Sequence, residues 1–491
     1  MFRRGHGESL ASSGDYLSTN AAGIEPPNPS LHRLKVSMLR RLSPLLLLGF
    51  VQLGCYATIL SLGDLGNNIS AFVPLFFLCF LFYILSILFA ERRFSGISAS
   101  PSVLLLIVAL FSVAFRLTMI SLKPSLSHDI MRFFWDGRLL NHGFNPYLYR
   151  PDSAELDALK DVPYFWDYEF KNTFTVYPPL AQLLFGGAYL FAGGNPLGIK
   201  VAVAALDLLN ILLLAALLFR LGGDIAPSGL VLYAWSPLSI VESAGNGHIE
   251  PLPVFFLLLS LWLISRQRFR LSSLSYSLAC WSKLFPILLL PVYLKCLRES
   301  GRRCLNEFLL YFALSSVLFL SPVFITSGVN LLYQVVWYSQ NITYNPSIFM
   351  IVEDMFARLR VTSTLTSLIV YAAFLVVVVA SLRLRSTWSL SRLIDNSILV
   401  LGTYLLLAPA VFQWYVLWLL PFLALKGLNR NTVGWLCLSA AVVLPYLPQF
   451  SIDYDIHMIA LLEYAPLYIL LLVSAVPAAK CFIKARTSAW I

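Results

Sequence analysis

Residues 102–121 read SVLLLIVALFSVAFRLTMIS, an apolar run interrupted by a single charged residue, Arg116. A helix that crosses the hydrocarbon core of a bilayer needs about 20 mainly apolar residues, so this run is long enough to span a membrane. Apolar runs of similar kind recur from Leu45 to Ala479. The chain is therefore predicted to be an all-α, polytopic integral membrane protein.

The composition of the chain supports this prediction. Of its 491 residues, 58% are apolar and 12% are charged, whereas a soluble domain is roughly half apolar and about a quarter charged. A water-soluble enzyme is thus excluded. The net charge of +10 does not indicate nucleic-acid binding, because the basic residues lie in short clusters between the apolar runs and act as topology signals. The seven Cys contain no CxxC pair, so neither a disulfide framework nor a zinc site is predicted.

The basic clusters can all be placed on the cytoplasmic side, which sets the expected topology. Residues 1–44 are polar and basic and are predicted to be a disordered cytoplasmic arm. Residues 45–479 are predicted to form one transmembrane domain with about 13 or 14 crossings, and residues 480–491 a cytoplasmic tail. The crossings are expected near 45–62, 71–90, 102–121, 199–219, 228–242, 251–265, 306–326, 363–382, 396–411, 414–426, 432–448 and 458–479, with two short helices over 271–296.

Two segments follow the third crossing. Residues 121–177 are the longest polar stretch within the membrane domain and are predicted to be an outer loop, in the lumen or periplasm. Residues 178–194 are predicted to be a re-entrant or interfacial helix, because a crossing there would break the charge pattern. Several crossings, such as 228–242 and 414–426, are short. Short or broken helices at membrane depth are tolerated only where they line a protein cavity, so we expect a cavity.

The first outer loop holds the densest group of chemically capable residues. As a helix it places Asp129, Arg132 and Asp136 along one face. A carboxylate there can act as a general base if it stays ionised, which Arg132 or Arg138 would favour. The alternative is a solvated amphipathic helix in which these acidic and basic side chains pair with one another.

Charged residues also lie inside the predicted crossings. Arg116 would cost about 2.5–3.5 kcal/mol at membrane depth, so it either snorkels to the outer interface or binds an anionic lipid phosphate. Lys200 and Asp207 lie seven residues apart on one helical face. We expect these two to form an internal ion pair.

Three later positions have open interpretations. Lys283 lies at the tip of the two short helices and either neutralises a phosphate or is an ordinary cytoplasmic lysine. Asn246 and His248 suit hydrogen bonding to sugar hydroxyls or proton transfer, although such loops are more often structural. Residues 413–415, Gln-Trp-Tyr, either belong to the interfacial aromatic belt or stack on a sugar face or prenyl chain.

Several motifs together resemble a known family. The run from His128-Asp129 to Trp135-Asp136-Gly137-Arg138 resembles the first outer loop of GT-C glycosyltransferases, as do Gly143-x-Asn145-Pro146-Tyr147 and Val176-Tyr177-Pro178-Pro179. The resemblance is closest to bacterial polyprenyl-phosphomannose-dependent mannosyltransferases and more distant to the mannosyltransferase that begins the GPI glycan, GPI mannosyltransferase I. Supporting matches are Tyr233-Ala234-Trp235-Ser236-Pro237-Leu238, Asn246-Gly247-His248, Lys283-Leu284-Phe285-Pro286 and Trp414-Tyr415.

The resemblance implies a GT-C-like membrane enzyme that moves a hexose, mannose, from a polyprenyl-phosphate donor to a lipid-linked or glycan acceptor on the non-cytoplasmic face, with inversion. It makes Asp129 the expected catalytic base. Many relatives have a paired acidic motif where this chain has His128, so a second carboxylate is missing unless Asp136 takes that place. The expected donor-phosphate partners are Arg116, Arg132, Arg138 and Lys283. The expected sugar or acceptor contacts are His128, Asn246, His248, Gln413, Trp414 and Tyr415.

The leaving group of this reaction would be a monophosphate, so protein cations can suffice and no metal or other cofactor is expected to be required. The expected membrane is the bacterial inner membrane with an outward-facing site, or alternatively that of the endoplasmic reticulum. The competing function is a transporter or flippase of lipid-linked sugars. Transporters often show internal repeats with interrupted helices in both halves, and none is evident in this chain.

Overall fold

The computed structural model describes residues 29–94, 101–162, 171–222, 227–360, 362–383, 389–451 and 453–487. The chain divides into Met1–Ser43 and a compact unit, Pro44–Ile491. Within the described residues the fold is helical and contains no strand, with one isolated bridge between Tyr344 and Ala410. The predicted all-α fold class is confirmed.

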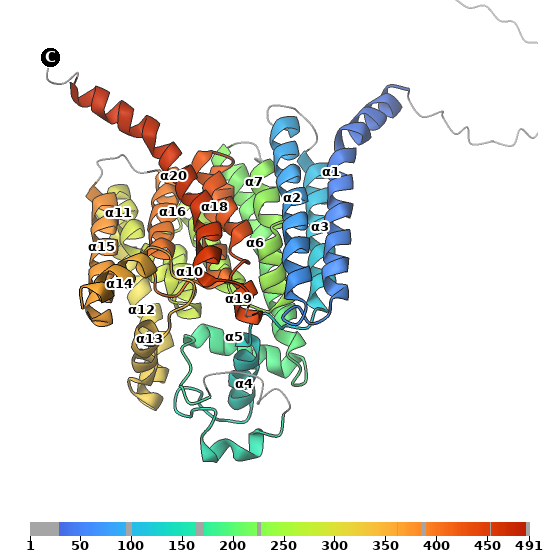
Figure 1. Ribbon diagram of the computed structural model, residues 1–491. Coiled ribbons are helices and arrows are strands. Elements are labelled where there is room, and N and C mark those ends of the chain that lie inside the picture. The colour runs from blue at the N-terminus through green and yellow to red at the C-terminus, as the bar shows by residue number, and fades with distance from the viewer. Residues whose placement is uncertain are drawn as a thin grey trace, which may run out of the picture. The chain divides into compact units, whose positions relative to one another are not determined.

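The helices follow one another along the whole described chain (Figure 1). In the first third they are α1 (Pro29–Ser61), α2 (Ile69–Phe94), α3 (Pro101–Ile120), α4 (Asp129–Asn141), α5 (Pro179–Phe191), α6 (Leu197–Gly222), α7 (Pro227–Ala234) and α8 (Pro237–Ser239). The middle third contains α9 (Pro251–Ser265), α10 (Phe269–Ser282), α11 (Leu290–Ser300), α12 (Arg302–Ser327), α13 (Asn330–Asn341) and α14 (Ile348–Arg358). The last third contains α15 (Ser363–Arg383), α16 (Leu390–Leu407), α17 (Leu420–Lys426), α18 (Arg430–Ala441), α19 (Tyr446–Phe450) and α20 (Ile456–Thr487). Short turns of other helical types are η1 (Ala154–Leu159), η3 (Ile240–Gly245), η4 (Phe285–Leu289) and η5 (Gln413–Trp418).

Nine of the described helices are long and apolar enough to cross a membrane, so the protein is a multi-pass membrane protein. Some of the 13 or 14 predicted crossings are not single helices in the structure. Residues 228–242 are divided among α7, α8 and η3, and residues 414–426 between η5 and α17. The two short helices predicted around Lys283 are α10 and α11, with η4 between them.

The structure describes part of each predicted end segment. Residues 1–28 of the predicted arm lie outside the described residues, and residues 29–44 form the start of α1 rather than irregular chain. Of the predicted tail, residues 480–487 continue α20 and residues 488–491 lie outside the described residues.

The segment predicted to be the first outer loop, residues 121–177, contains α4 and is followed by α5, and both helices lie with α13 at the same end of the long helices (Figure 1). α5 has 13 residues, which gives a length of about 20 Å, too short for a bilayer core of about 30 Å. α4 starts with Asp129 and has Arg138 in its last turn, charges that suit the two ends of the helix dipole. The ring of Phe133 stacks on Phe185 of α5 with 4.7 Å between centroids, so one face of α4 is held firmly against α5.

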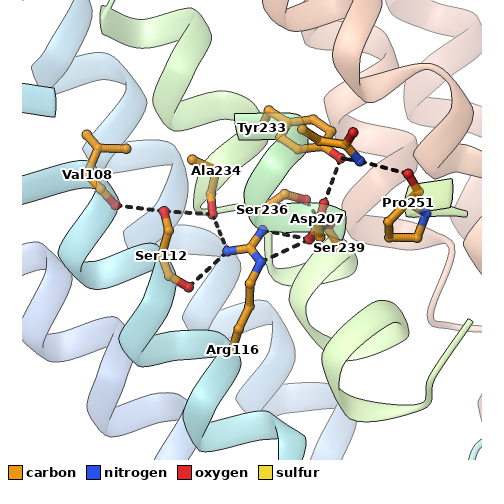
Figure 2. A network of polar contacts seen from close by, with 10 residues as sticks. Val108, Ser112, Arg116, Asp207, Tyr233, Ala234, Ser236, Ser239 and Pro251 are labelled. Atoms are coloured by element: carbon orange, nitrogen blue, oxygen red, sulfur yellow. Dashed lines mark hydrogen bonds and ion pairs between the residues drawn. The ribbon is translucent and has the colours of Figure 1, made fainter. Parts of the chain in front are cut away.

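A buried ion pair joins the long helices next to this loop (Figure 2). Arg116 on α3 donates from Nε and Nη2 to Asp207 Oδ2 on α6, at 3.0 and 2.7 Å. Both side chains are almost fully buried. Tyr233 and Ser239 also donate to Asp207, at 2.7 and 3.0 Å. The carboxylate therefore has four donor groups from three parts of the chain.

The break between α7 and α8 supplies a further partner of Arg116. α7 ends at Ala234, and Pro237 then stands at the first position of α8 with Ser236 as its N-cap. The last carbonyls of a helix have no partner within it. The carbonyl of Ala234 accepts instead from Arg116 Nη1 at 3.0 Å. One guanidinium thus ties α3 to α6 and to the broken segment after α7.

The expected pairing of Lys200 with Asp207 is wrong. Lys200 Nζ donates to the carbonyl of Leu122, and Asp207 pairs with Arg116. The reason is position along the α6 axis: Asp207 lies at the depth of Arg116, whereas Lys200, on the same face, lies nearly two turns nearer the loop.

Substituting Arg116 alone is expected to destabilise the protein by about 3–5 kcal/mol, because it leaves Asp207 as a buried charge without a cation. The double variant Arg116→Met with Asp207→Asn removes both charges. The amide oxygen introduced at position 207 can still accept from Tyr233. The double variant should recover most of the lost stability. Thermal unfolding in detergent measures both variants.

The matched control is Lys123→Met, which breaks an exposed pair with Asp64 and should cost about 0–1 kcal/mol. A double variant no more stable than Arg116→Met would contradict this account of the pair.

Candidate active site

A cavity of about 830 Å³ lies where several distant segments of the chain converge. Its walls come from residues 126–129, 173–178, 334–344, 412–418 and 446–450, together with Lys283 and its neighbours. Residues 126–129 and 173–177 belong to the predicted outer loop 121–177. The cavity that the short helices led us to expect is therefore present, and η5 forms part of its wall.

Asp129 lines the cavity from the first turn of α4. Its side chain is 39% exposed, and Tyr177 OH donates to Oδ2 at 3.4 Å. Burial raises the pKa of Asp129 to about 6, although Lys283 opposes the shift. A carboxyl with this pKa is mostly ionised at pH 7 and can accept a proton at the cavity wall.

Two cations line the same cavity. Lys283 Nζ pairs with Glu250 Oε1 and lies 5.1 Å from the ring centroid of Tyr415. Arg132 donates from Nε to Asp136 at 2.9 Å and from Nη1 to the carbonyl of Thr173 at 3.2 Å. Its Nη2 is buried and has no hydrogen-bond partner among the described residues. Arg132 thus keeps one unused donor beside the cavity that it lines.

Aromatic and amide groups form another wall. Gln413 donates from Nε2 to Tyr344 OH at 2.8 Å, and Tyr344 stacks on Phe412 with 4.6 Å between centroids. Tyr415 faces Tyr338, with 3.4 Å between the hydroxyls. These rings and amides line the cavity. Such a surface can stack on a sugar ring and exchange hydrogen bonds with its hydroxyls.

Trp414 and His128 also line the cavity. Besides Asp129 and Arg132, the cavity therefore brings together six residues that the sequence analysis had named. Asn246 and His248 are only 1% exposed and are not among its lining residues. His248 follows Gly247, whose φ of +82° favours glycine and whose Cβ, if present, would lie 2.6 Å from Ile130 Cδ1. The loop therefore holds His248 behind the cavity wall. The six lining residues are His128, Lys283, Gln413, Trp414 and Tyr415 from the predicted sets, with Tyr177 from the family motif.

Three candidates lie away from the cavity. Arg116 is fully engaged by Asp207 and backbone carbonyls at membrane depth, so it is not placed to bind a donor phosphate. Arg138 binds Asp161 and Tyr189 on the far side of α4. Asp136 is buried behind Arg132, with Oδ1 accepting from Arg132 Nε and Oδ2 from Gln182 Nε2. Asp136 therefore does not supply a second carboxylate to the cavity.

Sequence reasoning missed several residues of the site. Tyr338 and Tyr344 lie outside every motif of the family resemblance. Glu242 and Glu250 flank the Asn246-Gly247-His248 motif, but their spacing indicates no partner. The signal that was present is Tyr177, which is part of the family motif and contacts Asp129.

Within the described part of the chain, no group of three or more His, Cys, Asp or Glu side chains is arranged to hold a metal ion. The cavity instead offers a carboxylate, two cations and aromatic rings.

Comparison with known proteins gives one family. Residues 56–298 match the family model described as "Alpha-(1->6)-mannopyranosyltransferase, N-terminal domain". No curated protein matches the chain. The matched region includes Asp129, Arg132 and Lys283, and ends before the aromatic wall at residues 412–418.

Proposed function

Because residues 56–298 match the N-terminal domain of alpha-(1->6)-mannopyranosyltransferases, we propose that the chain transfers mannose from a polyprenyl-phosphate donor to a hydroxyl of a lipid-linked or glycan acceptor. This match supports an enzyme that transfers mannosyl groups. The lipid-phosphate donor, the non-cytoplasmic location of the site and inversion at the anomeric carbon are the parts that we propose.

The observation that carries the proposal is that one cavity is lined both by a carboxylate, Asp129, and by two cations, Lys283 and Arg132. The carboxylate can serve as the base, and the cations can bind the departing phosphate. In a single displacement the acceptor oxygen forms a bond to the anomeric carbon while the bond from that carbon to the phosphate oxygen breaks. The acceptor proton passes to Asp129, and polyprenyl phosphate leaves with the electron pair. Cations placed at the departing phosphate stabilise the charge that develops there.

The remaining walls of the cavity suit the other parts of the substrates. The rings and amides around Gln413 offer a surface for sugar rings. Exposed apolar side chains on α13, such as Leu332 and Val336, lie next to cavity-lining residues of the same helix. A prenyl chain can therefore reach the cavity from the lipid along this helix.

Asp129→Asn is expected to lower transfer by at least about a hundredfold, because an amide does not accept the acceptor proton. The measurement uses purified protein in detergent, radiolabelled polyprenyl-phosphate mannose and an α-(1->6)-linked mannobiose. In the wild type kcat/KM should rise with pH and reach half its maximum near pH 6, since burial raises the pKa of Asp129 to about 6 and only the ionised form is active.

The control is Asp152→Asn, an exposed carboxyl of the same loop that pairs with Arg150 and should leave transfer unchanged. Full activity in Asp129→Asn would exclude Asp129 as the base. Absence of transfer in the wild type, in detergent where no compartments exist, would contradict the enzyme and favour a transporter of lipid-linked sugars.

Transfer is expected to persist after exhaustive chelation, because Lys283 and Arg132 can neutralise a monophosphate without a metal. The same assay with EDTA-treated and extensively dialysed protein measures this. Loss of transfer that Mg²⁺ or Mn²⁺ restores would show that a cation is required.

A further inference from the structure

His248 lies directly behind Asp129 and is held there from several directions. Its side chain is 2% exposed, and its ring stacks on Trp414 with 3.5 Å between centroids and 18° between planes. The left-handed backbone conformation of Gly247, the preceding residue, directs the chain so that His248 lies in this position. Such enclosure leaves the imidazole little freedom to rotate.

The two ring nitrogens of His248 face two different carboxyl groups. Nδ1 lies 3.9 Å from Asp129 Oδ2, and Nε2 lies 3.5 Å from Glu242 Oε2. Nε2 is buried and has no hydrogen-bond partner among the described residues. Buried polar groups are nearly always bonded, and catalytic hydrogen bonds that are long in the free enzyme often tighten with substrate. The geometry therefore identifies Asp129 and Glu242 as the partners of the ring.

Glu242 is itself fixed and is shielded from bulk solvent. Its side chain is fully buried, Tyr446 OH donates to Oε1 at 3.0 Å, and Asn246 Nδ2 donates to Oε2 at 3.2 Å. A carboxyl that is buried without a cation partner favours its protonated form. In that form Oε2 can donate to Nε2 of His248.

A neutral imidazole carries one donor and one acceptor. Burial keeps the pKa of His248 well below its usual value, so the ring is neutral. If Nε2 accepts from Glu242, the proton of the ring must be on Nδ1, which faces Asp129.

We propose that His248 is a positioning residue for Asp129, donating from Nδ1 to the catalytic carboxylate in a tautomer that Glu242 fixes from behind. The inference rests on the proposed function, because it takes Asp129 as the base. It replaces the expectation that His248 contacts a sugar, since His248 does not line the cavity. The N–H donor orients Asp129 and stabilises its ionised form.

Other charged and titratable groups also face Asp129, and they set its pKa together with His248. From packed elements they are Tyr177, Glu250, Lys283, Tyr338 and Tyr446, and from its own helix His128 and Arg132. These groups are unchanged in variants of His248. A change in the pH profile of such variants therefore reports on the His248 donor.

The test compares His248→Phe with His248→Asn in the mannose-transfer assay from pH 5 to 9. Phe keeps a ring to stack on Trp414 but has no donor, whereas the amide of Asn presents an N–H near the position of Nδ1. Loss of a donor to the charged form raises the pKa of a carboxyl. We expect the acidic limb of kcat/KM in His248→Phe to move up by about one pH unit, and that of His248→Asn to stay near the wild-type position.

A second pair of variants tests Glu242 without altering His248. Glu242→Gln keeps an N–H donor toward Nε2 and should retain the wild-type profile, whereas Glu242→Leu should shift the acidic limb upward as His248→Phe does. Thermal unfolding in detergent identifies any variant that is not folded. If a variant of one residue, His248 or Glu242, is unfolded, the pair of variants at the other residue tests the inference.

An unshifted limb in folded His248→Phe, or equal shifts in His248→Phe and His248→Asn, would overturn the inference. Failure of the proposed function gives a different result. In that case the wild type shows no transfer or Asp129→Asn keeps it, whereas failure of the inference alone leaves transfer dependent on Asp129.

Discussion

The buried pair of Arg116 and Asp207 constrains the whole amino-terminal half of the membrane domain. An arginine at membrane depth is costly unless its charge and its donors are satisfied. Here Asp207 supplies the charge, and the carbonyls of Ser112 and Ala234 accept from the same guanidinium. Because these groups belong to α3, α6 and the end of α7, their relative depth is fixed. α3 leads directly into the loop that carries Asp129, and the segment after α7 leads to Glu242 and His248.

The site is assembled on top of this arrangement from parts of the chain that are far apart in sequence. α4 brings Asp129 and Arg132, the α10–η4 junction brings Lys283, and η5 brings the aromatic wall. The loop motif at Asn145 and Tyr147 joins the segment after α4 to α12 and α13, because Asn145 bonds Thr326 of α12 and Asn330 of α13 bonds the carbonyl of Tyr147. Of the short elements that are poor membrane spans, η4, η5 and α19 border the cavity. This agrees with the rule that irregular backbone at membrane depth occurs where it is enclosed by protein.

The sequence predicted the fold class and the residues whose role is local. The lengths of the apolar runs predicted most of the long helices. The short apolar runs on either side of Lys283 predicted two short helices with a break between them. Asp129 and Lys283 could be selected from motifs, and both line one cavity. Partners across the chain were beyond reach, since Arg116 and Asp207 are 91 positions apart and the helical-face rule favoured Lys200 instead. The same reason hid Tyr338 and Tyr344, which join the site only through tertiary packing.

The central claim is that one sugar phosphate lies between Asp129 and the cations of this cavity. The most direct measurement is a cryo-EM structure with a non-hydrolysable phosphonate analogue of polyprenyl-phosphate mannose. The account predicts phosphonate oxygens at about 3 Å from Lys283 Nζ or Arg132 Nη2, with Asp129 on the opposite side of the anomeric carbon. A head group bound outside this cavity, or Asp129 on the same side as the phosphonate, would contradict it.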